Sequence, residues 1–201
     1  MNEYFSSKDS LGRPRYGVGF DLFARGDDHP DDQNRITAED LVATSFLSVD
    51  IPGWVAQDLL EGVLGHEVAA QLRDIPPTVQ IGSQDAPDLL KGPAQRAWDA
   101  LRARGTGGRD SRGYGIGSVT RAKLLARKRP HLIPVSDSVI RGALGKPTNL
   151  WNYHQALFLD HGDELRRLLD QARTDAGVDG RVSHLRLLDV IVWMRHSRKA
   201  G

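Results

Sequence analysis

The chain of 201 residues contains no cysteine. This excludes disulfide bonds, zinc sites built on thiolates and iron–sulfur clusters held by cysteine. The chain also lacks an apolar run near the roughly 20 residues that a membrane-spanning helix needs. Its first residues show neither the basic block nor the apolar block of a signal peptide. These absences favour a cytoplasmic protein that uses no metal ion and no other cofactor.

The composition is that of a globular protein, with 39% hydrophobic and 26% charged residues. Apolar residues recur at helical spacing over 54–64 and 183–196, and no segment shows sustained strand alternation. Thr37 and Asp40 have the spacing of a capping box, and Asp163 is expected to cap a helix over 164–174. The sequence therefore predicts an all-α fold with one helical domain over residues 1–201.

A glycine-rich turn leads into a basic helix near the middle of the chain. Gly113, Gly115 and Gly117 have no side chains, so backbone N–H groups at the turn can point at an anion. The window 102–129 holds nine basic residues and one acid, whereas the whole chain carries a net charge of +1. This concentration of charge predicts a surface that binds a polyanion.

The same residues allow two other interpretations. A dinucleotide fingerprint requires a buried strand before the first glycine, but residues 104–112 are polar and typical of a loop. Asp137 follows the apolar run 132–135 and stands where a helix N-cap is expected. A capping role is compatible with a chemical role, because the helix N-terminus favours the ionised carboxylate.

Residues 114–122 and 134–141 resemble the helix-hairpin-helix DNA glycosylase superfamily, over a region of about 94–145. The resemblance implies two helical lobes with a cleft between them, a hairpin that grips the DNA backbone, and a catalytic aspartate at position 137. The chain as a whole also resembles an uncharacterised family of small proteins from high-GC bacteria, which implies no activity. The positions expected to bind DNA, through the hairpin and its basic extension, are Tyr114, Gly115, Ile116, Gly117, Ser118, Thr120, Arg121, Lys123, Arg127 and Lys128.

The family also uses a wedge that fills the gap left by the extruded base. Asp50 stands where the resemblance places this wedge, but an acid pressed into a duplex is unfavourable, so Val49 and Trp54 are alternatives. The aromatic and polar segment 149–154 offers candidates for a base pocket. These are Trp151, Tyr153 and His154.

The chemistry that the resemblance implies is hydrolysis of an N-glycosidic bond in double-stranded DNA. Asp137 would stabilise the positive charge on an oxocarbenium-like sugar, after the nucleotide has been rotated out of the duplex. Family members that also cut the strand use a lysine two positions after the second hairpin glycine, where this chain has Val119. Lys123 lies one helical turn further on and is expected to point elsewhere. We therefore expect a monomeric, monofunctional glycosylase that leaves an abasic site.

Three features stay open at the level of sequence. The excised base could be a damaged purine, an alkylated base or a modified base of bacteriophage DNA, which would imply antiviral defence. A non-catalytic helix-hairpin-helix DNA-binding protein and a small nucleotide-hydrolysing enzyme are the alternatives. The acidic cluster within 27–32 fits no known metal-binding spacing and is interpreted as a solvated loop.

Overall fold

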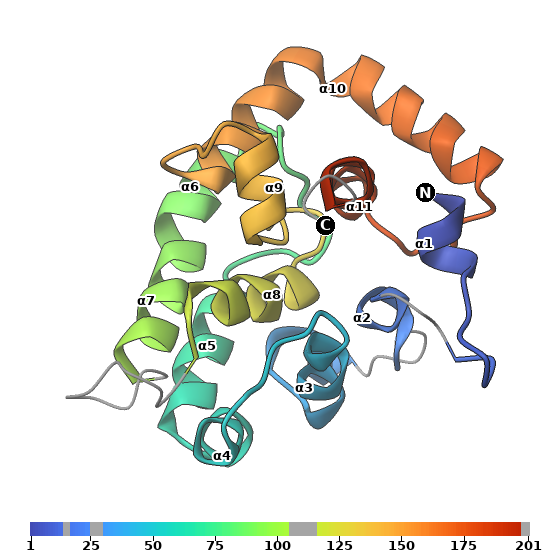
Figure 1. The fold of residues 1–201 in the computed structure, drawn as a ribbon. Coiled ribbons are helices and arrows are strands. Elements are labelled where there is room, and N and C mark those ends of the chain that lie inside the picture. The colour runs from blue at the N-terminus through green and yellow to red at the C-terminus, as the bar shows by residue number, and fades with distance from the viewer. Residues whose placement is uncertain (14–16, 25–29, 105–115, 198–201) are drawn as a thin grey trace.

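The computed structural model describes residues 1–13, 17–24, 30–104 and 116–197, and every regular element in these ranges is a helix (Figure 1). This confirms the prediction of an all-α fold. In the described ranges, no helix combines the length and the apolar character that crossing a bilayer requires. The elements are α1 (Asn2–Ser6), α2 (Val18–Leu22), η1 (Pro30–Asn34), α3 (Ala38–Ser45), α4 (Gly53–Glu61), α5 (Val63–Arg73), α6 (Ala86–Leu89), η2 (Leu90–Ala94), α7 (Gln95–Arg104), α8 (Ser118–Lys128), α9 (Ser138–Ala143), α10 (Leu150–Asp175) and α11 (His184–Ser197).

Local capping signals account for several helix starts. Asp40 donates its backbone N–H to the Thr37 hydroxyl, and the Asp40 carboxylate accepts the N–H of Thr37 at 3.1 Å. This confirms the predicted capping box. The prediction that Asp163 caps a helix is wrong, because α10 continues through that position. Within α10, only His161 departs from helical geometry. Packing of one long helix over the domain overrides the local capping preference there.

Helix α8 lies in the middle of the fold, where it packs against α3 and α7 (Figure 1). Its residues from Thr120 to Arg127 are all buried. A helix that is buried on every side normally carries apolar residues all round. Here cationic side chains share the interior with the apolar ones, so each buried cation needs a partner inside the protein.

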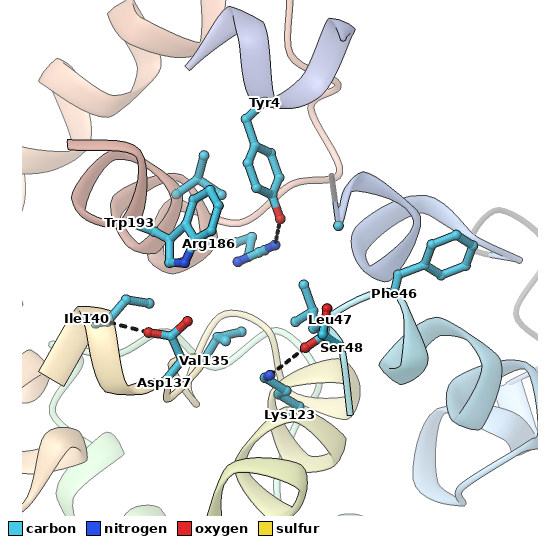
Figure 2. Close-up of a pocket in the computed structure, with 12 residues that line it drawn as sticks. Tyr4, Phe46, Leu47, Ser48, Lys123, Val135, Asp137, Ile140, Arg186 and Trp193 are labelled. Carbon is cyan, nitrogen blue, oxygen red and sulfur yellow. Dashed lines mark hydrogen bonds between the residues drawn. The ribbon is translucent and has the colours of Figure 1, made fainter. Parts of the chain in front are cut away.

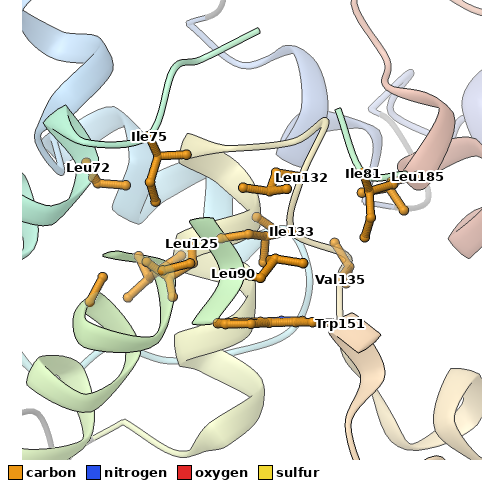
Figure 3. Packing of buried hydrophobic residues seen from close by; sticks show 14 of the residues in the cluster. Leu72, Ile75, Ile81, Leu90, Leu125, Leu132, Ile133, Val135, Trp151 and Leu185 are labelled. Carbon is orange, nitrogen blue, oxygen red and sulfur yellow. The ribbon is translucent and has the colours of Figure 1, made fainter. Parts of the chain in front are cut away.

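The buried hydrophobic residues form a cluster that draws side chains from α2, from α4 to α8, and from α10 and α11. The segment 132–135 runs through this cluster, with Leu132, Ile133 and Val135 all buried (Figure 3). Arg129 anchors the start of the segment, because its carbonyl accepts the N–H groups of Leu132 and Ile133. Asp137 is therefore attached to a backbone segment that the core holds in place.

Candidate active site

A cavity of about 440 Å³ lies beside the start of α9. This volume is within the usual range for small-ligand sites. Asp137 and Lys123 lie along one side of the cavity, and Tyr4, Arg186 and Trp193 lie along the other (Figure 2). The remaining lining residues are Gly17, Phe46, Leu47, Ser48, Val135, Ile140 and Val190. The cavity thus combines one carboxylate, two cations and aromatic rings.

Asp137 is the N-cap of α9. Its Oδ1 accepts the backbone N–H of Ile140 at 2.9 Å (Figure 2). This confirms the predicted capping role. No described residue hydrogen-bonds the second oxygen, Oδ2. One half of the carboxylate is therefore fixed by the helix, and the other half remains available to a ligand in the cavity.

Lys123 projects into the same cavity from α8, and its Nζ donates to the carbonyl of Leu47 at 2.7 Å (Figure 2). The expectation that Lys123 points away from Asp137 is therefore wrong. Burial lowers the pKa of the Lys123 ammonium, the Asp137 carboxylate opposes this shift, and the charge of Arg186 adds to it. The net result is a Lys123 pKa below its ordinary value. A cation with two N–H groups left to donate thus accompanies the carboxylate.

Arg186 forms the opposite wall as part of a buried network. Its Nε donates to Asp21 at 2.9 Å and its Nη2 donates to the Tyr4 hydroxyl at 2.5 Å. Burial would lower the pKa of Arg186, but the interactions with Asp21, Tyr4 and Asp189 together outweigh burial, and the pKa is raised. Gly17 permits this packing, because a Cβ atom there would lie 2.7 Å from the Tyr4 hydroxyl and 2.3 Å from Leu47. These contacts tie the N-terminal segment to the cavity.

The cations at the C-terminal end of α8 bind protein groups. Arg127 and Lys128 both pair with the buried carboxylate of Asp40, at 3.1 and 2.7 Å. Arg127 also donates to the Phe20 carbonyl, and Lys128 donates to the Asp32 carbonyl. The expectation that these two side chains face DNA phosphates is corrected by this placement, because protein acceptors already take their donors.

Two further arginines of the basic window are buried. Arg129 is 1% exposed and donates to the carbonyls of Ile75 and Leu72. Arg121 is 8% exposed and its guanidinium lies 4.6 Å from the centre of the Trp98 ring. This corrects the expectation that Arg121 belongs to an exposed phosphate-binding face. The basic side chains described from Arg121 to Arg129 therefore belong largely to the interior.

The model for the family described as "Family of unknown function (DUF6308)" matches residues 1–196. The chain belongs to this family. No curated protein and no solved structure matches the chain. The description of this family names no activity.

The predicted hairpin is described only in part. Tyr114 and Gly115 lie outside the described residues. Ile116 is buried in the core, whereas Gly117 and Ser118 are exposed where α8 begins. Thr120, one turn later, is buried, which corrects its assignment to a DNA-contacting surface. Within the described part of the predicted hairpin, Gly117 and Ser118 are the positions that remain accessible to a phosphate.

The residues predicted for a base pocket do not line the cavity of Asp137. Trp151 lines a separate cavity of about 240 Å³ together with Trp98, Ser136 and Arg141. Tyr153 is exposed at the surface, and His154 is fully buried between helices. The prediction that these three residues form a base pocket beside Asp137 is therefore wrong. Ser136 lines this second cavity, whereas Val135 and Asp137 line the first, so Trp151 and Asp137 face different cavities.

The wedge candidates lie just beyond the cavity wall. Phe46, Leu47 and Ser48, at the end of α3, line the cavity. Val49 and Asp50 follow them in sequence, and Trp54 is 40% exposed on α4. None of the three is part of the lining. Their role as a wedge stays a prediction.

Sequence reasoning missed the walls that α1 and α11 contribute. Tyr4 and Trp193 approach with ring centres 6.0 Å apart, although almost the whole chain separates them in sequence. Arg186, Val190 and Trp193 occur at helical spacing, which indicates one face of α11. That signal was visible in the sequence, but it resembles ordinary core periodicity and does not mark a cavity.

Proposed function

We propose that the protein is a monofunctional DNA glycosylase, with Asp137 as the carboxylate that acts on the sugar. The observation that carries the proposal is the position of Asp137. This residue is the N-cap of α9, and its Oδ2 is available in a cavity with aromatic walls. A nucleobase is a flat ring with polar edges. Aromatic side chains such as Trp193 and Phe46 suit its faces, and the N–H groups of Lys123 suit its carbonyl or ring-nitrogen acceptors.

In the proposed reaction, the bond between the base and the anomeric carbon breaks and the sugar becomes oxocarbenium-like. The Asp137 carboxylate stabilises that positive charge and orients the attacking water. The capped geometry limits the reorganisation that this interaction needs, because Oδ1 is held by the Ile140 amide. Lys123 places a positive charge where negative charge develops on the departing base.

The proposal extends to the architecture and the partner. We propose that the helices form the two lobes of a helix-hairpin-helix glycosylase-like fold, with double-stranded DNA bound by a monomer across the cleft. The backbone amides at the start of α8, near Gly117, would contact a phosphate. The interior position of the other α8 cations means that this contact depends on backbone groups more than on Arg127 or Lys128.

The test is base release, measured by mass spectrometry on normal, damaged and phage-modified DNA. Asp137→Asn keeps the side-chain size and the cap but removes the negative charge. We expect release to slow by about 10²–10⁴-fold with DNA affinity retained. Asp163→Asn, at a fully exposed carboxylate of α10, is the matched control and should leave the rate unchanged.

Two outcomes would contradict the proposal. Equal rates for the parent and Asp137→Asn would leave Asp137 as a helix cap only. DNA binding without release of any base would favour the non-catalytic DNA-binding alternative.

A further inference from the structure

A histidine and an aspartate face each other in the interior behind the candidate active site. His154 of α10 is 0% exposed and Asp189 of α11 is 1% exposed. His154 Nε2 and Asp189 Oδ1 lie 3.9 Å apart. Neither atom has a hydrogen-bond partner among the described residues. Two buried polar atoms that lack other partners and face each other need an explanation.

The surrounding hydrogen bonds fix where a proton must be. His154 Nδ1 lies 2.9 Å from the carbonyl of Leu150, which can only accept, so Nδ1 carries a hydrogen. Asp189 Oδ2 accepts the backbone N–H of Val135 at 2.9 Å. In a neutral imidazole and an ionised carboxylate, Nε2 and Oδ1 are both acceptors and would repel each other. The two atoms are 3.9 Å apart, which is beyond hydrogen-bond length, and a proton on Asp189 Oδ1 removes this repulsion.

The pair is connected to the cavity through the backbone. Val135 lines the cavity, and Asp137 follows it by two residues. On α11, Asp189 lies beside the cavity-lining residues Arg186 and Val190. The Asp189 carboxyl thus holds the segment that carries Asp137 without lining the cavity itself.

We propose that Asp189 is the positioning residue of this site: protonated and facing His154, its carboxyl holds the Val135 amide and thereby sets the orientation of Asp137. The protonation follows from the burial of two facing acceptor atoms and from the hydrogen on His154 Nδ1. Its consequence for catalysis rests on the proposed role of Asp137.

The electrostatic surroundings favour a neutral pair. Burial raises the pKa of Asp189 from its ordinary 3.8 to about 8, against the opposing charge of Arg186 and with the support of the negative charges of Asp137 and Asp21. Burial also lowers the pKa of His154. The proton therefore resides on Asp189 at neutral pH. A carboxyl whose pKa is raised by folding contributes stability that is complete below about pH 4 and is lost as pH rises to about 8.

Asp189→Asn and Asp189→Leu separate positioning from packing. The amide of Asp189→Asn can donate to His154 Nε2 and accept from the Val135 N–H, as the protonated acid does, but it does not titrate. We expect its base release to stay within about threefold of the parent, whereas Asp189→Leu leaves the Val135 amide unpaired and loses about tenfold or more. Equal loss in both variants would overturn the proposal.

Two measurements test the protonation of Asp189 beside His154 without any assay of activity. The melting temperature of Asp189→Asn minus that of the parent should grow from about pH 4 to about pH 8 and then level off. In ¹⁵N-labelled parent protein, His154 should show a protonated Nδ1 and an unprotonated Nε2 at pH 7. A constant temperature difference, or the opposite tautomer, would overturn the proposal. If the parent protein releases no base, the proposed function is contradicted. The melting temperatures and the His154 tautomer then still test the protonation of Asp189 and His154.

Discussion

The C-terminal end and the middle of α8 use their cations differently. At the C-terminal end, Arg127, Lys128 and the C-cap residue Arg129 are buried and hydrogen-bonded to a carboxylate or to backbone carbonyls. Halfway along the helix, Lys123 donates to one carbonyl and shares a cavity with Asp137. All four cations are removed from bulk water, but Lys123 keeps N–H groups available to a ligand.

This difference separates structural from chemical use of charge. A buried cation with its acceptors in place holds distant segments together, and removing an acceptor is costly. A cation beside a cavity keeps donors that a ligand can use. The basic composition of the window 102–129 therefore reports two roles, and the composition alone does not distinguish them.

The largest expected effect is at the C-terminal end of α8. Asp40→Ala leaves Arg127 and Lys128 buried without their carboxylate, so we expect the free energy of unfolding to fall by about 3–5 kcal/mol. Chemical denaturation would measure this. Asp163→Ala, at an exposed carboxylate of α10, is the control and should change stability by less than about 0.5 kcal/mol. If Asp40→Ala loses as little stability as the control, the cations at the C-terminal end of α8 have no special structural role, and the contrast with Lys123 fails.

A smaller effect is expected at the start of α8. A Cβ atom at Gly117 would meet no atom within 4 Å, so Gly117→Ala should fold. If the amides there contact a phosphate, the methyl group should weaken that contact and raise the Kd for duplex DNA about fivefold. Gly53→Ala, at the start of α4 and equally free of contacts, is the matched control for binding. Unchanged affinity in folded Gly117→Ala would place the DNA contact elsewhere.

The smallest expected signal is in a trapping experiment, where we expect no covalent adduct between the protein and DNA. The first ground for expecting no strand cleavage is Val119, which stands where the helix-hairpin-helix resemblance places the strand-cleaving lysine, but Lys123 does enter the cavity. Burial lowers the Lys123 pKa and the charge of Asp137 opposes that shift, but the ammonium donates to the Leu47 carbonyl, which holds Nζ in place. Borohydride treatment with substrate DNA should therefore trap nothing. An adduct that disappears in Lys123→Met would show that Lys123 is a nucleophile.

Local sequence signals determined the helical class and several helix starts. The Thr37 capping box and the cap at Asp137 depend on atoms within three residues of each other, so the pattern was sufficient to predict them. The same holds for the helical periodicity over 183–196, which α11 reproduces as His184–Ser197. Asp137 as a cap is thus a property of the sequence, while its catalytic role is a proposal.

Only the tertiary structure decided which charges are buried and which side chains share the cavity. Arg127 meets Asp40 across 87 residues, and Arg186 meets Tyr4 across 182. Neither pairing leaves a local pattern in the sequence. Buried charges require partners, and folding supplies those partners from distant segments, so the same basic residues that predict a DNA-binding surface become interior contacts. The direction of Lys123 and the pairing of His154 with Asp189 follow from the same packing.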